Sequence, residues 1–375
     1  MGTEKAILLV SLDFEMYWGV RDLYTLESCK QRLENTRTVV TRVLRQFEEH
    51  GIHATWATVG LLFSHDRAEL MNNLPRIRPD YDSPELSPYP GIEAVGRDES
   101  DDPYRYAPSL IEQILKSPGQ EIGTHTFSHY YCLENGQTKE AFRNDLEAAD
   151  HAAKMWGVNL RSLVFPRNHV NPEYLDVLAE FGIQSYRGCE RHWIYRPRMR
   201  SGKALFRRAA RLLDAYVNLS GHHTFSIDEI VEGPPFNFPS SRLLRMYLPA
   251  LRLFEPLRVA RICSGLDYAA HTGRVFHLWF HPEELAMDQD KNAGALEKVL
   301  DRFALLRDRG EMESLTMAEL AARLSARSVG QVANLRRVAN PPLAPVNNRR
   351  AACQAAPQVN SACSIRGNVQ GGHAG

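Results

Sequence analysis

Apolar runs alternate with amphipathic segments along most of the chain. The run Ala6–Leu12 is almost continuously apolar, which predicts a strand buried on both faces of a parallel sheet. The segment Leu26–His50 carries apolar residues at helical spacing, and Gly51 follows it as a stop signal. Because strand and helix signals keep alternating to about residue 325, the pattern favours the α/β class.

The other expected elements continue this alternation. Strands are expected at His53–Val59, Glu121–Thr124, Ser162–Phe165, Ile183–Tyr186 and Val275–Phe280. Helices are expected at Leu61–Leu70, Ser109–Leu115, Lys139–Trp156, Pro172–Phe181, Asn292–Arg309 and Met317–Ser325. Irregular insertions are expected at about 73–106 and 188–260. The first, with six prolines, is either a lid or substrate wall or a solvated excursion.

The composition changes beyond about Ala326. Asn, Gln, Ala, Pro and Gly dominate there, and apolar periodicity disappears. Such a segment cannot bury enough apolar surface to offset the entropy lost on ordering. We therefore expect one catalytic domain over residues 1–325 and a disordered tail over residues 326–375.

Charge and cysteine content narrow the function classes. Lys and Arg number 45, as do Asp and Glu, which argues against a global nucleic-acid or membrane-binding surface. The six cysteines are scattered without a CxxC pair and indicate free thiols. The first apolar run is too short for a signal sequence and is followed by acidic residues. We expect a cytoplasmic protein, with a peripheral position at the inner membrane face as a variant of that expectation.

Two acidic residues end the first strand. Asp13 and Glu15 alternate with Phe14, so on an extended backbone both carboxylates point to the same side. Buried carboxylates are costly unless a cation or a proton joins them. The alternative is a polar strand end in solvent.

Two histidines four residues apart follow the strand expected at Glu121–Thr124. If the segment is helical, His125 and His129 share one face, which suits two imidazoles on one divalent ion. Such spacing also recurs by chance, and its position after a strand adds weight to it. In a parallel α/β barrel, active sites form at this end of the strands.

A late apolar strand ends in His281-Pro282. An imidazole at a strand end suits a general acid, while His277, four residues earlier, is expected to be a core histidine. A competing interpretation makes His281 a third nitrogen ligand of the ion. Arg167 follows another strand and would orient a carboxylate by a bidentate contact.

The stretch Arg187–Arg211 is strongly basic. It contains eight Arg and one Lys but only one acid, Glu190. Arg207, Arg208 and Arg211 fall on one face of an expected amphipathic helix. They form either a solvated surface face or a patch for a phosphate-bearing substrate or lipid head group, through which the chain would contact a membrane or a lipid-linked substrate.

Taken together, these motifs resemble the polysaccharide-deacetylase family, the NodB-homology family also called carbohydrate esterase family 4. The motifs occur in that family's order over roughly residues 5–325: an acidic pair, then an HxxxH motif, then a loop that carries an arginine, and last a strand that ends in His-Pro. The resemblance implies a distorted (β/α) barrel of the polysaccharide-deacetylase type. It also implies one divalent metal ion, usually Zn²⁺, held by an acid and two histidines.

The resemblance assigns roles residue by residue. His125 and His129 match the metal histidines, Asp13 the catalytic base and His281 the catalytic acid. The family's usual motif has two adjacent aspartates, whereas here Phe14 stands second and Glu15 becomes the replacement ligand. Which of the two acids binds metal is left open at this point. Arg167 carries over as a catalytic residue, although the usual Arg-x-Pro order is Pro166-Arg167 here.

Aromatic residues follow the first motif closely. Tyr17 and Trp18 would stack on a sugar ring or pack at the barrel rim. In the absence of the family's tryptophan motif, Trp193 is the candidate to support the arginine.

The implied activity is metal-dependent removal of an N-acyl group, in particular N-acetyl, from an amino sugar. The substrate would be nucleotide-linked, lipid-linked or an oligosaccharide. One alternative is a metal-dependent amidase or imidase acting on a small non-sugar C–N bond. The other is an inactive carbohydrate-binding homologue, because the acidic motif deviates.

Overall fold

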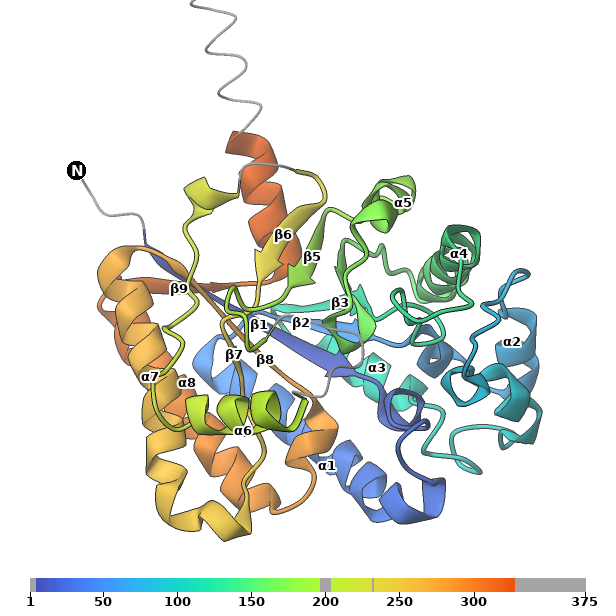
Figure 1. The fold of residues 1–375 in the computed structure, drawn as a ribbon, viewed down its shortest axis with the longest axis horizontal. Helices are drawn as coiled ribbons and strands as arrows, with labels where there is room; N and C mark the ends of the chain where they lie inside the picture. The colour runs from blue at the N-terminus through green and yellow to red at the C-terminus, as the bar shows by residue number, and fades with distance from the viewer. Residues whose placement is uncertain (1–4, 196–203, 231–232, 328–375) are drawn as a thin grey trace, which may run out of the picture. The chain divides into compact units, whose positions relative to one another are not determined.

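The computed structural model describes residues 5–195, 204–230 and 233–327, and its centre is one parallel sheet (Figure 1). The sheet has nine strands in the order β6-β5-β4-β3-β2-β1-β8-β7, and β9 also pairs with β1. The strands are β1 (Ala6–Phe14), β2 (Ala54–Thr58), β3 (Gln120–Thr124), β4 (Ser162–Val164), β5 (Ser185–Gly188), β6 (Phe236–Pro239), β7 (Arg242–Leu243), β8 (Val275–Phe280) and β9 (Met312–Leu315). The predicted α/β class and distorted barrel are confirmed.

Strand β1 is the centre of this sheet. It pairs with β8 along one edge, while its other edge pairs with β9 near its start and with β2 near its end. All nine of its residues are buried. Pairing on both edges and helices on the faces explain why the strand reads as an almost unbroken apolar run.

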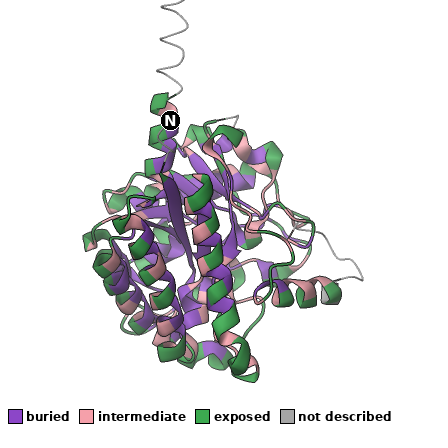
Figure 2. Ribbon diagram, turned by 90° about the vertical axis from the view of Figure 1, so that its left-hand side faces the viewer, coloured by how far each residue is buried: buried purple, intermediate pink, exposed green. Residues whose placement is uncertain are grey.

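Helices cover the sheet, and their buried faces point toward it (Figure 2). They are α1 (Leu26–His50), α2 (Arg67–Asn72), α3 (Pro108–Lys116), α4 (Lys139–Met155), α5 (Leu175–Glu180), α6 (Ala204–Asp214), α7 (Glu255–Thr272) and α8 (Gln289–Asp308), and a further helix covers 317–327. Helix α8 packs against both α1 and α7. Helix α1 has the predicted bounds, because Thr25 caps its first turn and Gly51 ends it at φ 64°.

Several short 3-10 helices connect these elements. They are η1 (Met16–Gly19), η2 (Gly60–Phe63), η3 (Pro84–Leu86), η4 (Tyr89–Ala94), η5 (Pro166–Asn168), η6 (Pro172–Tyr174), η7 (Ile227–Glu229), η8 (Pro249–Phe254) and η9 (Pro282–Leu285). The single helix predicted at Leu61–Leu70 is wrong, since η2 and α2 divide that stretch. Residues 73–106 form an insertion with only short 3-10 turns, as predicted.

The second predicted insertion, 188–260, contains more structure than expected. Besides the expected amphipathic helix, observed as α6, it holds β6, β7 and the start of α7. Strands of four and two residues are too short to show a periodic pattern. The apolar stripe of α7 is interrupted by Arg258 and Arg261, whose side chains are nevertheless buried.

Two further expectations concern cysteines and the tail. The four cysteines within the described ranges, Cys29, Cys132, Cys189 and Cys263, are free thiols as predicted. Of the predicted tail, 328–375 lies outside the described residues. No helix in the described part of the chain is both long enough and apolar enough to cross a bilayer.

Candidate active site

The carboxyl ends of four strands bring polar side chains to one edge of the sheet. Asp13 lies near the end of β1, His125 follows β3, Arg187 lies in β5, and His281 follows β8. Parallel strands end at the same edge, so residues far apart in the chain meet there. The motifs at the strand ends predicted the active site at this edge.

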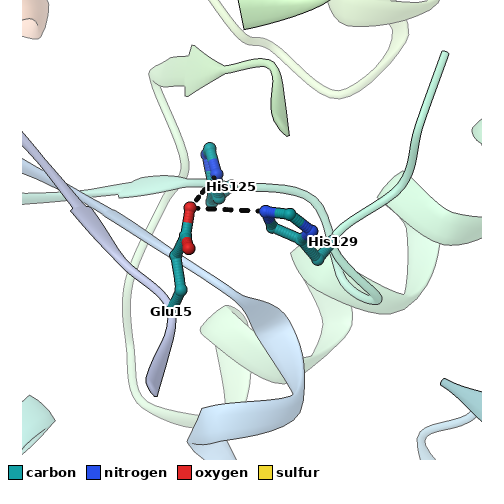
Figure 3. Close-up of side chains that lie close together, drawn as sticks. All are labelled: Glu15, His125 and His129. Atoms are coloured by element: carbon teal, nitrogen blue, oxygen red, sulfur yellow. Dashed lines mark hydrogen bonds and ion pairs between the residues drawn. The ribbon is translucent and has the colours of Figure 1, made fainter. Parts of the chain in front are cut away.

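A carboxylate and two imidazoles meet at this edge (Figure 3). Glu15 Oε1 lies 2.8 Å from His125 Nε2 and 3.3 Å from His129 Nε2. All three residues are buried, and one ligand atom from each lies within 4.8 Å of the other two. The residues predicted to bind metal are therefore close together, while metal binding by them stays a prediction.

The loop between the two histidines is irregular, so the expectation of a helical HxxxH is wrong. Thr126 and His129 adopt positive φ angles of 64° and 59°. Asp145 of α4 holds the loop by accepting hydrogen bonds from the backbone N–H groups of Phe127 (2.6 Å) and Ser128 (3.2 Å). Loop conformation, and not helical periodicity, makes the two imidazoles converge on Glu15.

The state of these side chains fits a divalent cation. His125 Nδ1 lies 2.8 Å from the carbonyl oxygen of Val164, so Nδ1 carries the proton and Nε2 keeps its lone pair. His125 Nε2 is buried and makes no hydrogen bond. Burial lowers the pKa of His129 to about 4, which keeps this ring neutral. One carboxylate and two imidazoles form a donor set that zinc prefers.

Asp13 is fixed by an arginine from β5. Arg187 donates from Nη1 to Asp13 Oδ1 and from Nη2 to Oδ2, both at 2.6 Å. Arg187 also lies 4.3 Å over the Trp279 ring. Burial alone would raise the pKa of Asp13, but the charge and hydrogen bonds of Arg187, together with the nearby His125 and His281, outweigh burial and lower it. Asp13 is therefore an ionised carboxylate in fixed orientation.

Arg167 does not make the bidentate contact that the sequence analysis expected of it. It pairs with Asp22 and Glu134 and lies 4.3 Å over the Tyr131 ring. Trp193, the candidate to support this arginine, is 53% exposed. Arg187 makes the bidentate contact with a carboxylate instead, and Trp279 is the tryptophan that packs against this arginine. Arg187 was not expected at this site, because the strand was predicted to end at Tyr186 and instead runs to Gly188.

His281 lies beside both carboxylates. Its Nε2 is 3.6 Å from Asp13 Oδ2 and 3.7 Å from Glu15 Oε1. Burial opposes protonation, but Glu15, Glu284 and Asp13 raise the pKa of His281 to about 9. This position agrees with either predicted role, general acid or third nitrogen ligand. His277 is a buried core histidine as expected, with Nε2 2.9 Å from Ser11 Oγ.

Glu283 is a neighbour of this cluster that the sequence analysis did not select. Its Oε1 accepts hydrogen bonds from the backbone N–H groups of Glu15 (3.1 Å) and Met16 (2.6 Å). Burial and the nearby charge of Glu15 raise the pKa of Glu283 to about 7. Glu283 thus fixes the backbone that carries Glu15, and its only sequence signal was its place two residues after His281.

One cavity of about 600 Å³ is lined by residues of this cluster, namely Asp13, Glu15, His129 and His281. Tyr17 and Trp18 are not among the residues that line this cavity, and their contact with a sugar ring stays a prediction. Trp18 is buried and donates from Nε1 to the carbonyl oxygen of Arg105 at 2.9 Å, which is the rim packing considered as the alternative. The insertion 73–106 contributes no residue to the cavity wall either.

Comparison with known protein families gives one match, which covers part of the chain. The model of the polysaccharide deacetylase family matches residues 25–186, a range that includes His125 and His129 but neither the acidic pair nor His281. No curated protein matches the chain.

Solved structures show the same fold. A "putative polysaccharide deacetylase from Mycobacterium smegmatis" aligns with a TM-score of 0.55 and 14% identity, covering 88% of this chain and 93% of that one. A "probable polysaccharide deacetylase from Pseudomonas aeruginosa PAO1" gives 0.51 and 11%, covering 86% and 92%. The Puue allantoinase gives 0.52 and 9%, covering 87% and 92%. The family match over residues 25–186 and the shared fold agree with the resemblance of this chain to the polysaccharide deacetylase family.

Proposed function

We propose that this protein is a metal-dependent hydrolase that removes an N-acyl group, in particular N-acetyl, from an amino sugar. One observation carries the proposal. The Glu15–His125–His129 cluster and the Arg187-anchored carboxylate of Asp13 face the same cavity. Such a site combines the donors for a Lewis acid with a separate base, which is what amide hydrolysis requires.

The residues divide the work of amide hydrolysis among them. Glu15, His125 and His129 would hold one divalent ion, for which their donor set favours zinc. When bound, this ion supplies Lewis-acid polarisation of the amide carbonyl and an activated water at neutral pH. Asp13 accepts the proton of the attacking water, because its contact with Arg187 keeps it ionised and oriented.

His281 completes the proposed mechanism. It gives a proton to the departing nitrogen, since an amide anion is a poor leaving group and the neighbouring carboxylates favour the protonated form of this imidazole. Its ring lies within 3.7 Å of both carboxylates, so acid and base border the same space. We assign no catalytic step to Arg167, which borders the cavity while paired with Asp22.

The substrate class includes nucleotide-linked, lipid-linked and oligosaccharide amino sugars, and we propose a cytoplasmic site of action. If the substrate is lipid-linked, we propose that Arg207, Arg208 and Arg211 contact the membrane peripherally. These residues border the cavity.

A second candidate function is hydrolysis of a small non-sugar C–N bond. One protein of the same fold is an allantoinase, which favours this candidate as the alternative. An inactive carbohydrate-binding homologue is the third possibility for a chain with a divergent acidic motif.

One experiment separates these functions. The purified full chain is supplied with Zn²⁺ and incubated with a panel of N-acetylated sugars and a panel of cyclic ureides, and products are followed by mass spectrometry. We expect loss of an acetyl group from an amino sugar and none of this activity in Asp13→Asn. Turnover of ureides alone would replace the proposal by the second function, and metal binding without turnover of either panel would favour the third.

A further inference from the structure

The cavity has a second, basic wall away from the catalytic carboxylates. Arg207, Arg208 and Arg211 of α6 border it, together with Arg242 of β7 and Arg245 just beyond that strand. The helix agrees with the amphipathic pattern of its sequence, whereas the strand lies in a segment that was expected to be irregular. Folding therefore brings two separate groups of arginines to the cavity that holds Asp13 and Glu15.

These arginines differ in how their charges are compensated. Arg242 donates from Nη1 to Asp214 Oδ2 at 2.6 Å, and that carboxylate is buried. Arg207 donates to the carbonyl oxygens of Trp193 (3.1 Å) and Ile194 (3.2 Å). These two side chains are thus held in place by the protein itself.

The remaining three have no such partner. Among residues 5–195, 204–230 and 233–327, no carboxylate lies within 4.0 Å of the guanidinium groups of Arg208, Arg211 or Arg245. Arg211 is half-buried, and burial followed by the charges of Arg245 and Arg207 lowers its pKa. Like charges gathered on one wall of a cavity, with no carboxylate in ion-pair contact with them among the described residues, are a cost to the free protein that an anionic ligand would remove.

We propose that this basic wall binds a phosphate or diphosphate group of the substrate, so that the acylated amino sugar is a sugar phosphate. The assignment of the substrate as an acylated amino sugar rests on the proposed function, whereas the anion site rests on the arginines alone. Guanidinium groups match phosphate oxygens with pairs of parallel hydrogen bonds, which a neutral polysaccharide could not use. A cavity of about 600 Å³ that joins both walls allows one ligand to touch them together.

The first test is binding and needs no turnover. Pyrophosphate is titrated calorimetrically into the Zn²⁺-loaded full chain, into Arg211→Gln with Arg245→Gln, and into Arg309→Gln as the control. Arg309 is exposed and lies before β9, away from the carboxyl edge of the sheet. We expect the double variant to bind roughly 10-fold or more weaker, since each hydrogen bond to a charged group contributes substantially. Equal binding by all three proteins would overturn the anion site.

The second test measures kcat/KM for three forms of one N-acetylated amino sugar. One form is neutral, one is linked to a nucleoside diphosphate, and one is linked to a polyprenyl diphosphate in phosphatidylcholine vesicles. We expect one of the two phosphorylated forms to be preferred by roughly 10-fold or more, and the double variant to lose that preference. The preferred form tells which source supplies the diphosphate.

The two tests separate this proposal from the proposed function. Pyrophosphate binding that depends on Arg211 and Arg245, without deacetylation of any form, would support the anion site and contradict the sugar assignment. Preference for the neutral form, with the double variant unaffected, would overturn the phosphate proposal and leave the deacetylase intact. Urea unfolding at neutral pH checks that the double variant is folded, which we expect because neither side chain has an ion-pair partner among the described residues.

Discussion

Arg187 holds Asp13 with two parallel hydrogen bonds of 2.6 Å, and both side chains are buried. An ion pair in this setting stabilises the fold only while both partners are present. Removing one partner leaves a charge that water cannot reach, which typically costs about 3–5 kcal/mol. This relationship makes Arg187 the most sensitive residue of the site for stability.

We therefore expect Arg187→Gln to lower the free energy of unfolding by about 3–5 kcal/mol, measured by urea denaturation at neutral pH. Arg143→Gln is the matched control, because Arg143 contacts Glu180 through two nitrogens at a partly exposed position. Its loss should cost about 1 kcal/mol or less. Adding Asp13→Asn to Arg187→Gln should restore part of the stability, and a further loss instead would show that the two side chains do not act as a pair.

Metal content gives the second prediction. The full chain, purified and dialysed against Zn²⁺ at micromolar concentration, should carry close to one equivalent by elemental analysis. His125→Ala and His129→Ala should each lose most of it, because each removes one of three donors. His50→Ala tests the exposed Glu49–His50–Glu297 group and should keep the metal. Full occupancy in the two active-site variants would disprove the assigned ligands.

The fold was predictable where periodic signals were long. Helix α1 and strand β8 have the predicted bounds, because an apolar stripe and an apolar run respectively define them. Strands β6 and β7 were missed, since pairing within the sheet and not local pattern determines them. In α7, buried Arg258 contacts Glu255 in the same helix, so a core position carries a charged residue.

The site was predictable in its residue types and less so in its connections. Glu15, His125 and His129 were selected together because acids and imidazoles follow strands that end at one edge. Two features of the site depend on geometry that sequence does not encode locally. A shift of two residues in β5 put Arg187 inside the sheet, and the contact of Trp18 with Arg105 turned the indole into the core.

The third prediction concerns stability at low pH. Asp214 is buried among Arg242, Tyr195 and Ser220. Burial alone would raise its pKa, but Arg242 and these hydroxyl donors lower it well below the usual value of 3.8. A carboxylate with a depressed pKa stabilises the fold above its unfolded pKa, and this contribution is lost as the pH falls toward the folded pKa.

The stability difference between the natural protein and Asp214→Asn should therefore be large at pH 7 and shrink below about pH 4, when measured by urea unfolding along a pH series. Asp176→Asn serves as the control, because Asp176 is exposed and pairs with Lys139 at the surface. The stability difference between the natural protein and Asp176→Asn should be small over the whole pH series. A difference for Asp214→Asn that grows as the solution is acidified would have the opposite sign and would contradict this assignment.

The last prediction concerns the role of His281. If it is the general acid, His281→Asn should keep metal content near that of the natural protein and slow amide hydrolysis by roughly 10²–10⁴-fold. The same variant should slow an activated acetyl ester much less, because a good leaving group departs without a proton. His277→Asn is not a suitable control, since His277 is buried and contacts Ser11, which also accepts a hydrogen bond from Arg187. His50→Asn, at a distant and partly exposed site, is the appropriate one.

The competing assignment of His281 as a third nitrogen ligand makes the opposite prediction. Its Nε2 lies within 3.7 Å of Glu15 Oε1, so a cation held by Glu15 would have this ring nearby as well. In that case His281→Asn should lower metal affinity, and amide and ester rates should fall together when metal is limiting. Excess Zn²⁺ would then restore much of both rates. Amide hydrolysis that stays slow at saturating Zn²⁺, beside a nearly normal ester rate, is the result that assigns proton donation to His281, because only the amide needs that proton.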